Sequence, residues 1–507
     1  MGYGSLRQTE PAMTLAAATP APRRVHPALP LAALLFLALR LYFDLNADPV
    51  GDEAYYWMWG QHPAWSYFDH PPLHAWLLFV VSHLFGWSRF TVRLTTWLAL
   101  VLVLWVFRQW SRKLAPSDSD SWFWAATVLY LASPFYFAMT SIAYNDHLVV
   151  AFGLLALHGF TTFAERWAAG TANAARWLYA AAIARGLATL SKYNGAVIGL
   201  GFAAALLLRK DLRSALRSPH PWLAGLLAVA MQAPVLYWNL TEGFASFRFH
   251  MHDRWGDQPW HFALLPPLAF VVLNVLMLSP FLLWPLVRML RGKPASPFES
   301  QLKTVSVATM TISCLGFFAM TIAIGGHFYW NILAFIGILP LLVRWVGTRV
   351  QFWLHVLYGF VCAGLLVFNF AVTPVAPLVN YGDRGSSINI DWPTVAAHMR
   401  AAQQAHPADL VAGTRYSTAS QIGFALGTTV AVPITREPKH EYQYWIDRAA
   451  LAGKSALILT DEDDGSPVLQ YLSQSFSNLT MVDDFTITRF GREVYHWRIF
   501  HGDDYKP

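Results

Sequence analysis

The sequence predicts a polytopic α-helical membrane protein with about eleven spans and juxtamembrane helices, followed by a small C-terminal α/β domain outside the membrane. Of its 507 residues, 55% are hydrophobic and only 13% are charged, against about 25% charged in a typical soluble domain. Apolar runs of about 17–25 residues, the length that crosses a bilayer as a helix, recur up to residue 373. From about residue 380 charged residues return and the apolar runs shorten to strand length, which indicates the second domain.

The chain begins with a polar tail rich in Ala and Pro, residues 1–28, which contains Arg23 and Arg24. Basic residues favour the cytoplasmic side, so this tail is predicted to be cytoplasmic. The apolar run that follows continues into Arg40 and Asp44 without a small-residue cleavage site, which predicts a signal anchor rather than a removed signal peptide. The transmembrane domain is expected over residues 29–375 and the extracytoplasmic domain over residues 380–507.

Basic loops indicate how often the chain crosses the membrane. If residues 71–85 formed a full span, the loop with Arg108, Arg112 and Lys113 would lie outside, and every later loop would be inverted. If this stretch lies along the outer membrane surface instead, the later basic loops all fall inside, as the positive-inside rule requires. Residues 71–85 are therefore predicted to form a juxtamembrane helix. The predicted spans are residues 29–45, 91–110, 122–141, 147–164, 177–191, 195–208, 222–238, 262–287, 304–324, 331–347 and 351–373.

The C-terminal part alternates apolar or β-branched runs with helical patterns, which predicts a small α/β domain. By the parity of the spans, this domain lies outside the membrane. The predicted strands are Val430–Ile434, Ala456–Leu459, Phe485–Arg489 and Val494–Phe500, and the predicted helices are Ser417–Leu426, Glu441–Leu451 and Val468–Phe476.

The net charge of +6 does not indicate a nucleic-acid partner, because Lys and Arg gather in the short loops that orient a membrane protein. Membrane lipid is the expected surrounding. Cys314 and Cys362 both lie in apolar runs, so they are predicted to be small buried hydrophobic side chains rather than a disulfide.

The most informative segment is the first outer loop, directly after the first apolar run. It contains Gly51-Asp52-Glu53-Ala54-Tyr55-Tyr56-Trp57 and, after a gap, Tyr67-Phe68-Asp69-His70-Pro71-Pro72-Leu73. Carboxylates at a membrane boundary are costly to desolvate, so they indicate a functional site. Aromatic residues beside carboxylates are typical of a pocket for a sugar or a cation.

Further polar residues fall on the same side of the membrane. Carboxylates can deprotonate an acceptor hydroxyl, and cations, or a metal held by carboxylate and His, can neutralise a departing phosphate. The set therefore suits a reaction at a lipid headgroup. Its members are Asn145, Asp146 and His147 after the third span, Lys192 after the fifth, Trp238, Asn239, Arg248, His250, His252, Asp253 and Arg254 after the seventh, and His327 after the ninth.

In these motifs the chain resembles the GT-C superfamily of polyprenyl-phosphate-sugar-dependent glycosyltransferases. Within it, the chain is similar to the bacterial branch related to protein O-mannosyltransferases, lipid A aminoarabinose transferase and the rhizobial lipopolysaccharide galacturonosyltransferases. The resemblance covers about residues 30–345. It rests on the two first-loop motifs, Arg93-Leu94, the Asp146 region, Leu190-Ser191-Lys192 and the His327–Trp330 region.

The resemblance implies an inverting glycosyltransferase that takes a sugar from a polyprenyl-phosphate donor. Its active site is expected to face the periplasm at a bacterial inner membrane. Lipid A or lipopolysaccharide core is the expected acceptor, and protein Ser/Thr is the alternative. Which sugar is transferred stays open.

The resemblance also implies roles for single residues. Asp52 is the expected general base, Glu53 orients it or shares its proton, and Asp146 is the second catalytic acid. Asp69 occupies a position associated with metal binding in some members, so the need for a divalent metal ion stays open. The residues expected to bind substrate are Tyr55, Tyr56, His70, Lys192, Arg254 and His327, with Lys192 and Arg254 as phosphate contacts.

Structural alternatives stay open for these residues. Asp52 precedes a helical run, where Asp is a common N-cap, and Asp69 is placed to begin a turn. Lys192 is also explained as an interface lysine whose ammonium reaches water. Tyr55 and Tyr56 fit an aromatic belt equally well.

A transporter or lipid flippase is the rival class. It would show inverted repeats and broken helices with ionisable residues near mid-membrane. Here the charged residues gather at one face and no repeat is visible, which favours an enzyme.

Overall fold

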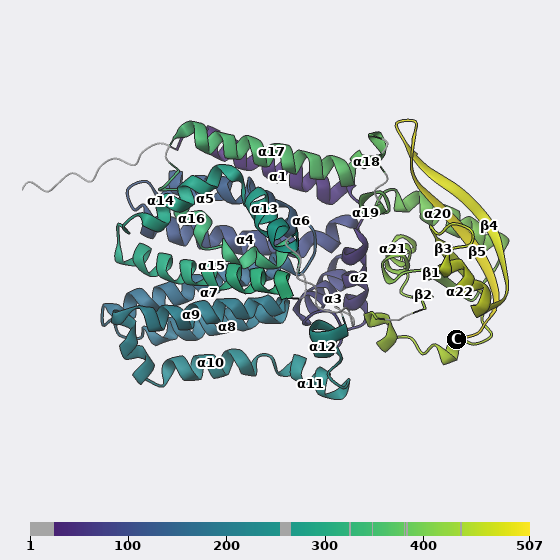
Figure 1. Ribbon diagram of the computed structural model, residues 1–507, viewed down its shortest axis with the longest axis horizontal. Helices are drawn as coiled ribbons and strands as arrows, with labels where there is room; N and C mark the ends of the chain where they lie inside the picture. Colours follow the sequence, from purple (N-terminus) through teal and green to yellow (C-terminus); the bar gives the residue numbers. More distant parts are fainter. Residues whose placement is uncertain are drawn as a thin grey trace, which may run out of the picture.

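The computed structural model of the protein describes residues 25–253, 265–323, 326–346, 348–379, 381, 384–436 and 439–507. A bundle of helices forms the larger part, and a smaller α/β part lies at one end of it (Figure 1). This confirms the predicted fold class, a polytopic helical protein with a small C-terminal α/β domain.

The helical part comprises α1 to α17 and five tighter or wider turns. The helices are α1 (Ala28–Asn46), α2 (Gly51–Gln61), α3 (Leu73–Phe85), α4 (Arg89–Leu114), α5 (Ser119–Leu131), α6 (Pro134–Ser141), α7 (Asp146–Ala168), α8 (Ala175–Ser191), α9 (Ala196–Leu208), α10 (His220–Ala230), α11 (Ala233–Thr241), α12 (Ala245–Arg248), α13 (Leu265–Leu278), α14 (Leu283–Arg291), α15 (Pro297–Ala323), α16 (Ile338–Leu342) and α17 (Arg349–Ala371). The turns are η1 (Tyr193–Gly195), η2 (Lys210–Arg217), η3 (Phe249–Asp253), η4 (Pro280–Leu282) and η5 (Phe328–Ala334). Side-chain caps start two of the long helices: Ser88 Oγ accepts from Thr91 N, and Thr348 Oγ1 accepts from Gln351 N.

Five helices in the described part of the chain are long and apolar enough to cross a bilayer: α1, α4, α7, α15 and α17. The number rises to eight if each of three bent helix pairs is counted as one span. The other predicted spans, residues 177–191, 195–208 and 331–347, contain shorter helices, α8, α9 and α16, of 17, 13 and 5 residues. The protein is thus a multi-pass membrane protein, in which helix length alone supports fewer complete spans than the basic loops predict.

Each bent pair breaks beside a proline. α5 and α6 meet at 74° before Pro134, α10 and α11 at 43° beside Pro234, and α13 and its continuation through η4 and α14 at 83° before Pro280. Proline lacks a backbone N–H and disfavours helical geometry in the preceding residue, so a helix does not continue unbent through it.

α17 donates hydrogen bonds to carbonyl groups at one of these breaks. The carbonyls of Leu276 and Phe281 are each followed four residues later by a proline, which has no N–H to donate. Tyr358 Oη donates to Leu276 O at 2.9 Å, and Gln351 Nε2 donates to Phe281 O at 2.9 Å. The side chains of α17 thus supply partners that water does not supply inside a bilayer.

The predicted juxtamembrane stretch forms α3, a short apolar helix that packs against α2. Gly60 makes the close approach possible, because a Cβ at this position would lie 2.9 Å from Leu78 Cβ. The first outer loop thus forms a compact pair of helices at the end of the bundle that faces the C-terminal part (Figure 1).

The C-terminal part contains a five-stranded sheet in the order β2-β1-β3-β5-β4. The first three strands are parallel, and β5 pairs antiparallel with β3 and with β4. The strands are β1 (Leu410–Gly413), β2 (Ala431–Pro433), β3 (Ala456–Thr460), β4 (Phe476–Arg489) and β5 (Arg492–Tyr505). The helices and turns are α18 (Val375–Leu378), α19 (Arg384–Ser387), α20 (Trp392–Ala405), α21 (Tyr416–Leu426), η6 (Glu441–Tyr444), η7 (Ala449–Leu451) and α22 (Pro467–Ser475).

The four predicted strands match β2, β3, β4 and β5, and two predicted helices match α21 and α22. The predicted helix over Glu441–Leu451 is wrong, since this stretch forms the separate turns η6 and η7. Asp447 Oδ1 accepts from Ala449 N at 3.0 Å between them and takes a backbone donor away from helical bonding. α20 and the short strand β1 were not predicted.

Helices cover both faces of this sheet. Val411, Leu457 and Leu459 share a core with α20 and α21, whereas Ala412 and Ile458 share another with α22. Because neighbouring strand residues point to opposite faces, α21 and α22 lie on opposite sides of the sheet.

α21 packs directly on the start of α2 (Figure 1). A Cβ on Gly51 would lie 2.9 Å from Ser417 Cβ, so only a glycine fits there without displacement. Gln421 Nε2 donates to Pro49 O at 3.1 Å, and Trp392 N donates to Asp48 Oδ2 at 3.0 Å. The C-terminal domain therefore covers the loop that carries the predicted site.

Candidate active site

Asp52 and Glu53 occupy the first turn of α2, where negative charge is favourable. The residue at the N-cap position is Val50. The alternative that Asp52 is an N-cap is therefore wrong. The Asp52 side chain is partly exposed, and Glu53 is fully buried.

The carboxylate of Glu53 accepts four hydrogen bonds. Its Oε1 accepts from Arg93 Nε at 2.9 Å and from Ala143 N at 2.7 Å, and its Oε2 accepts from Arg93 Nη2 at 2.5 Å and from Val50 N at 3.1 Å. Both side chains of the ion pair have no exposed surface. Glu53 therefore fixes the first turn of α2, which agrees with the expected orienting role, and its oxygens are buried. Its catalytic role stays a prediction.

Two tyrosines bring the other first-loop acids together. Tyr416 Oη from α21 donates to Asp52 Oδ1 at 3.2 Å, and Tyr55 Oη donates to Asp69 Oδ2 at 2.7 Å. The rings of Tyr55 and Tyr416 lie 4.5 Å apart. Asp52 and Asp69, which are far apart along the loop, therefore belong to one cluster.

The environment keeps both phenols protonated. Burial, followed by the charges of Asp69 and Glu441, raises the pKa of Tyr55 well above its ordinary value. The charge of Asp52, followed by burial, raises the pKa of Tyr416. Each tyrosine is therefore a donor to a carboxylate.

Asp146 and Lys192 form a second buried pair. Asp146 begins α7, Lys192 follows α8, and Lys192 Nζ lies 2.7 and 2.8 Å from the two carboxylate oxygens. Lys192 is 6% exposed, so the alternative of an ammonium reaching into water is wrong. Its ammonium also lies 5.1 Å from the centre of the Tyr329 ring.

His70 lies beside Tyr56, the residue that follows Tyr55 in α2. Its ring centre is 5.9 Å from that of Tyr56 and 6.2 Å from that of His250. His250 Nε2 is hydrogen-bonded to Asp69 O at 2.8 Å, which links η3 to the first loop. His74 lies deeper, and burial lowers its pKa to about 3, so its imidazole is neutral.

His327 is exposed and stacks on Tyr329, with ring centres 5.1 Å apart. Through Tyr329 it is connected to Lys192. Arg254, the other predicted phosphate contact, lies outside the described residues.

Two residues of the C-terminal domain were missed at this site, Tyr416 and Glu441. Glu441 Oε2 accepts from Phe68 N at 2.5 Å, and Glu441 N donates to Tyr55 Oη at 2.6 Å. Burial raises the pKa of Glu441 well above its ordinary value. No local pattern marks either residue, because their contacts are with residues more than 300 positions earlier in the chain.

The described residues contain no group of three or more His, Cys, Asp and Glu side chains that could hold a metal ion. The role of Asp69 as a metal ligand stays a prediction.

Comparisons with known proteins agree with this architecture. Residues 69–238 match the family described as dolichyl-phosphate-mannose-protein mannosyltransferase. The chain is 27% identical over 270 residues to lipid A galacturonosyltransferase RgtD of Rhizobium johnstonii (strain DSM 114642 / LMG 32736 / 3841), which is 51% of this chain and 53% of that protein. The chain thus aligns with about half the length of this curated relative.

The fold is that of ArnT from Cupriavidus metallidurans. The crystal structure of ArnT bound to undecaprenyl phosphate has a TM-score of 0.61 at 14% identity and covers 93% of this chain and 98% of ArnT. The apo structure has a TM-score of 0.57 at 16% identity and covers 94% and 98%. The match to ArnT shows the fold, and the family match and the relative, together with this fold, support the GT-C superfamily for this chain.

Proposed function

We propose that the protein is an inverting glycosyltransferase that moves a sugar from a polyprenyl phosphate to lipid A on the periplasmic face of a bacterial inner membrane. The relative RgtD, whose name gives lipid A as acceptor, and ArnT, whose structure contains undecaprenyl phosphate, support this assignment. Galacturonic acid is the first sugar to test, since it is the one in the name of the relative.

The observation that carries the proposal is the joining of Asp52 and Asp69 in one partly exposed cluster. Their carboxylates accept from Tyr416 and Tyr55, whose rings are in contact. The neighbouring acid Glu53 is sealed in an ion pair, so Asp52 is the first-turn acid with a surface that an acceptor can reach.

In the proposed reaction Asp52 takes the proton of an acceptor hydroxyl. The hydroxyl oxygen forms a bond to the anomeric carbon from the face opposite the phosphate, and the bond between this carbon and the phosphate oxygen breaks. The electron pair leaves with the polyprenyl phosphate, and the configuration inverts. General-base catalysis by one positioned group contributes about 10²–10⁴-fold to a rate.

Lys192 is the proposed contact for the leaving phosphate. Asp146 holds its ammonium in place at 2.7 Å, and the ring of Tyr329 restricts the other side. A fixed cation at the point where negative charge develops lowers the barrier without reorganising at the moment of reaction.

Mass spectrometry of lipid A from cells without the gene tests the proposal. Complementation with wild type is expected to restore a sugar mass that Asp52→Asn does not restore. Asp120→Asn is the matched control, because this acid is exposed and pairs with Arg108 at the other end of the helices. An unchanged lipid A with a changed glycoprotein spectrum would move the acceptor to protein, and no change in either would overturn the proposal.

A further inference from the structure

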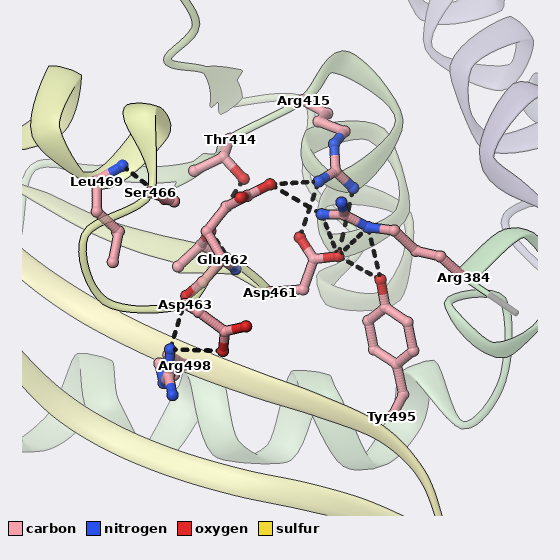
Figure 2. A network of polar contacts seen from close by, with 11 residues as sticks. Arg384, Thr414, Arg415, Asp461, Glu462, Asp463, Ser466, Leu469, Tyr495 and Arg498 are labelled. Atoms are coloured by element: carbon pink, nitrogen blue, oxygen red, sulfur yellow. Dashed lines mark hydrogen bonds and ion pairs between the residues drawn. The ribbon is translucent and has the colours of Figure 1, made fainter. Parts of the chain in front are cut away.

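A network of ion pairs fixes the start of α21. Arg415 lies between the end of β1 and the start of α21, and Asp461 and Glu462 follow the neighbouring parallel strand β3. Carboxyl ends of parallel strands meet at one edge of a sheet. Arg415 Nη2 is 3.1 Å from Asp461 Oδ1 and 2.7 Å from Glu462 Oε1 (Figure 2).

The same two carboxylates bind the segment that leads out of the membrane. Arg384 of α19 places Nη2 2.5 Å from Asp461 Oδ2 and 2.9 Å from Glu462 Oε1. Tyr495 of β5 also donates to Asp461, whose side chain is 4% exposed (Figure 2). Charge-assisted bonds with this geometry are among the stronger polar contacts in proteins. The network therefore ties the linker, the sheet edge and the start of α21 into one unit.

Tyr416 is the residue directly after Arg415. α21 is seated on α2 by the close contact of Ser417 with Gly51, and Tyr416 Oη donates to Asp52 Oδ1. The ring of Tyr416 packs on that of Tyr55, which fixes the direction of the phenol. The chain of contacts runs from the ion-pair network through Arg415 and Tyr416 to the carboxylate of Asp52.

We infer that Tyr416 is a positioning residue that the C-terminal domain supplies to the active site, an inference that rests on the proposed transfer reaction. Its hydroxyl holds Oδ1 of Asp52 and limits rotation of the carboxylate, so that the base meets the acceptor hydroxyl in one orientation. Misplacing a reacting group by a small distance lowers turnover more than it lowers binding. The C-terminal domain is then part of the reaction machinery.

The first test is the kinetics of Tyr416→Phe in the full-length protein. The probe is transfer from polyprenyl-phosphate-linked galacturonic acid to lipid A. We expect kcat to fall about tenfold or more while KM for the donor changes by less than about twofold, since a bond to a charged group is removed and the ring stays. Tyr471→Phe is the matched control, because it removes a hydroxyl from α22 on the opposite side of the sheet, and kcat is expected to stay unchanged.

The second test needs no activity. Melting temperatures of wild type, Asp52→Asn, Tyr416→Phe and the double variant form a double-mutant cycle, and residues in contact give shifts that do not add. Wild-type kcat in Tyr416→Phe together with additive shifts would overturn the inference and leave the proposed function standing. If wild type transfers no sugar to lipid A, the proposed function fails, and additive shifts in the cycle then decide separately against the Tyr416–Asp52 contact.

Discussion

Asp52 and Glu53 are adjacent in the sequence and in opposite environments. Glu53 faces the helix bundle, has no exposed surface and gives its oxygens to Arg93 and two backbone N–H groups. Asp52 faces the C-terminal domain, is partly exposed and accepts from a phenol. The first turn of one helix thus separates an acid that holds the fold from an acid that can exchange a proton. Two acids in one motif do not need to share one role.

The largest effect is expected on the turnover of Asp52→Asn, which tests whether Asp52 is the acid that exchanges a proton. Asp52→Asn keeps the size of the side chain and removes the base, so turnover is expected to fall about 10²–10⁴-fold. The melting temperature is expected to stay close to that of wild type, because the side chain is partly exposed and Asn keeps its shape. Transfer kinetics and differential scanning fluorimetry check the two halves. Near-normal turnover would remove Asp52 from the role of base.

Glu53→Gln tests the other side. It removes the closer of the two buried carboxylates that pair with Arg93 and leaves Asp44 at 3.9 Å. Breaking a buried pair in this way costs about 3–5 kcal/mol of folding free energy. Denaturation in detergent measures the loss. Glu165→Gln is the control, because Glu165 pairs with Lys113 at 3.0 Å where both are solvent-accessible, and such pairs are worth about 0–1 kcal/mol. Equal losses of folding free energy in Glu53→Gln and Glu165→Gln would contradict the structural role of Glu53.

Lys192→Ala tests whether the Asp146–Lys192 pair stabilises the fold or binds the phosphate of the donor. If Lys192 binds the phosphate, affinity for undecaprenyl phosphate is expected to fall about 10-fold to 100-fold, since a charge-assisted bond is lost. Calorimetry in nanodiscs measures this affinity. Lys303→Ala is the control, because Lys303 donates to Leu290 O and Gly292 O, away from the site. A drop in stability with unchanged affinity would mean that the Asp146–Lys192 pair stabilises the fold, as the Glu53–Arg93 pair does, and does not bind the phosphate.

The smallest effect is expected in the pH dependence of stability, through Glu441 of the C-terminal domain. Burial raises the pKa of Glu441 above its unfolded value of about 4.3. The protonated form is thus favoured by folding, so this contribution to stability is complete below the unfolded pKa and is lost as the pH rises through the folded pKa. Glu441→Gln removes the titration. Its melting temperature is expected to fall less than that of wild type as the pH rises above about 4.3, and parallel pH curves would contradict this.

The helical membrane part and most of the sheet could be predicted from local patterns, because apolar runs and alternating strands are visible along the chain. The pairing of Asp146 with Lys192, both of them predicted site residues, was found only in the structure. The same holds for Arg93, whose place in the motif gave no sign that it neutralises Glu53. Tyr416 and Glu441 could not be predicted, since nothing in their own segment depends on α2. The breaks within the predicted spans 122–141, 222–238 and 262–287 were not predicted, although a proline marks each of them. The sequence also did not say that α17 would donate to the carbonyls at the third break.

The hydrogen bonds from α17 to the broken helix around Pro280 have a consequence for biosynthesis. Among the described residues, α17 is the last long apolar helix to leave the ribosome. Yet Tyr358 and Gln351 donate to carbonyls of residues made 82 and 70 positions earlier. Until α17 inserts, those two carbonyls lack these donors in a medium where an unsatisfied group costs several kcal/mol. Assembly of the bundle is therefore finished by its final helix, and a nascent chain that stops before residue 349 is an incomplete membrane protein even though most of its spans are already made.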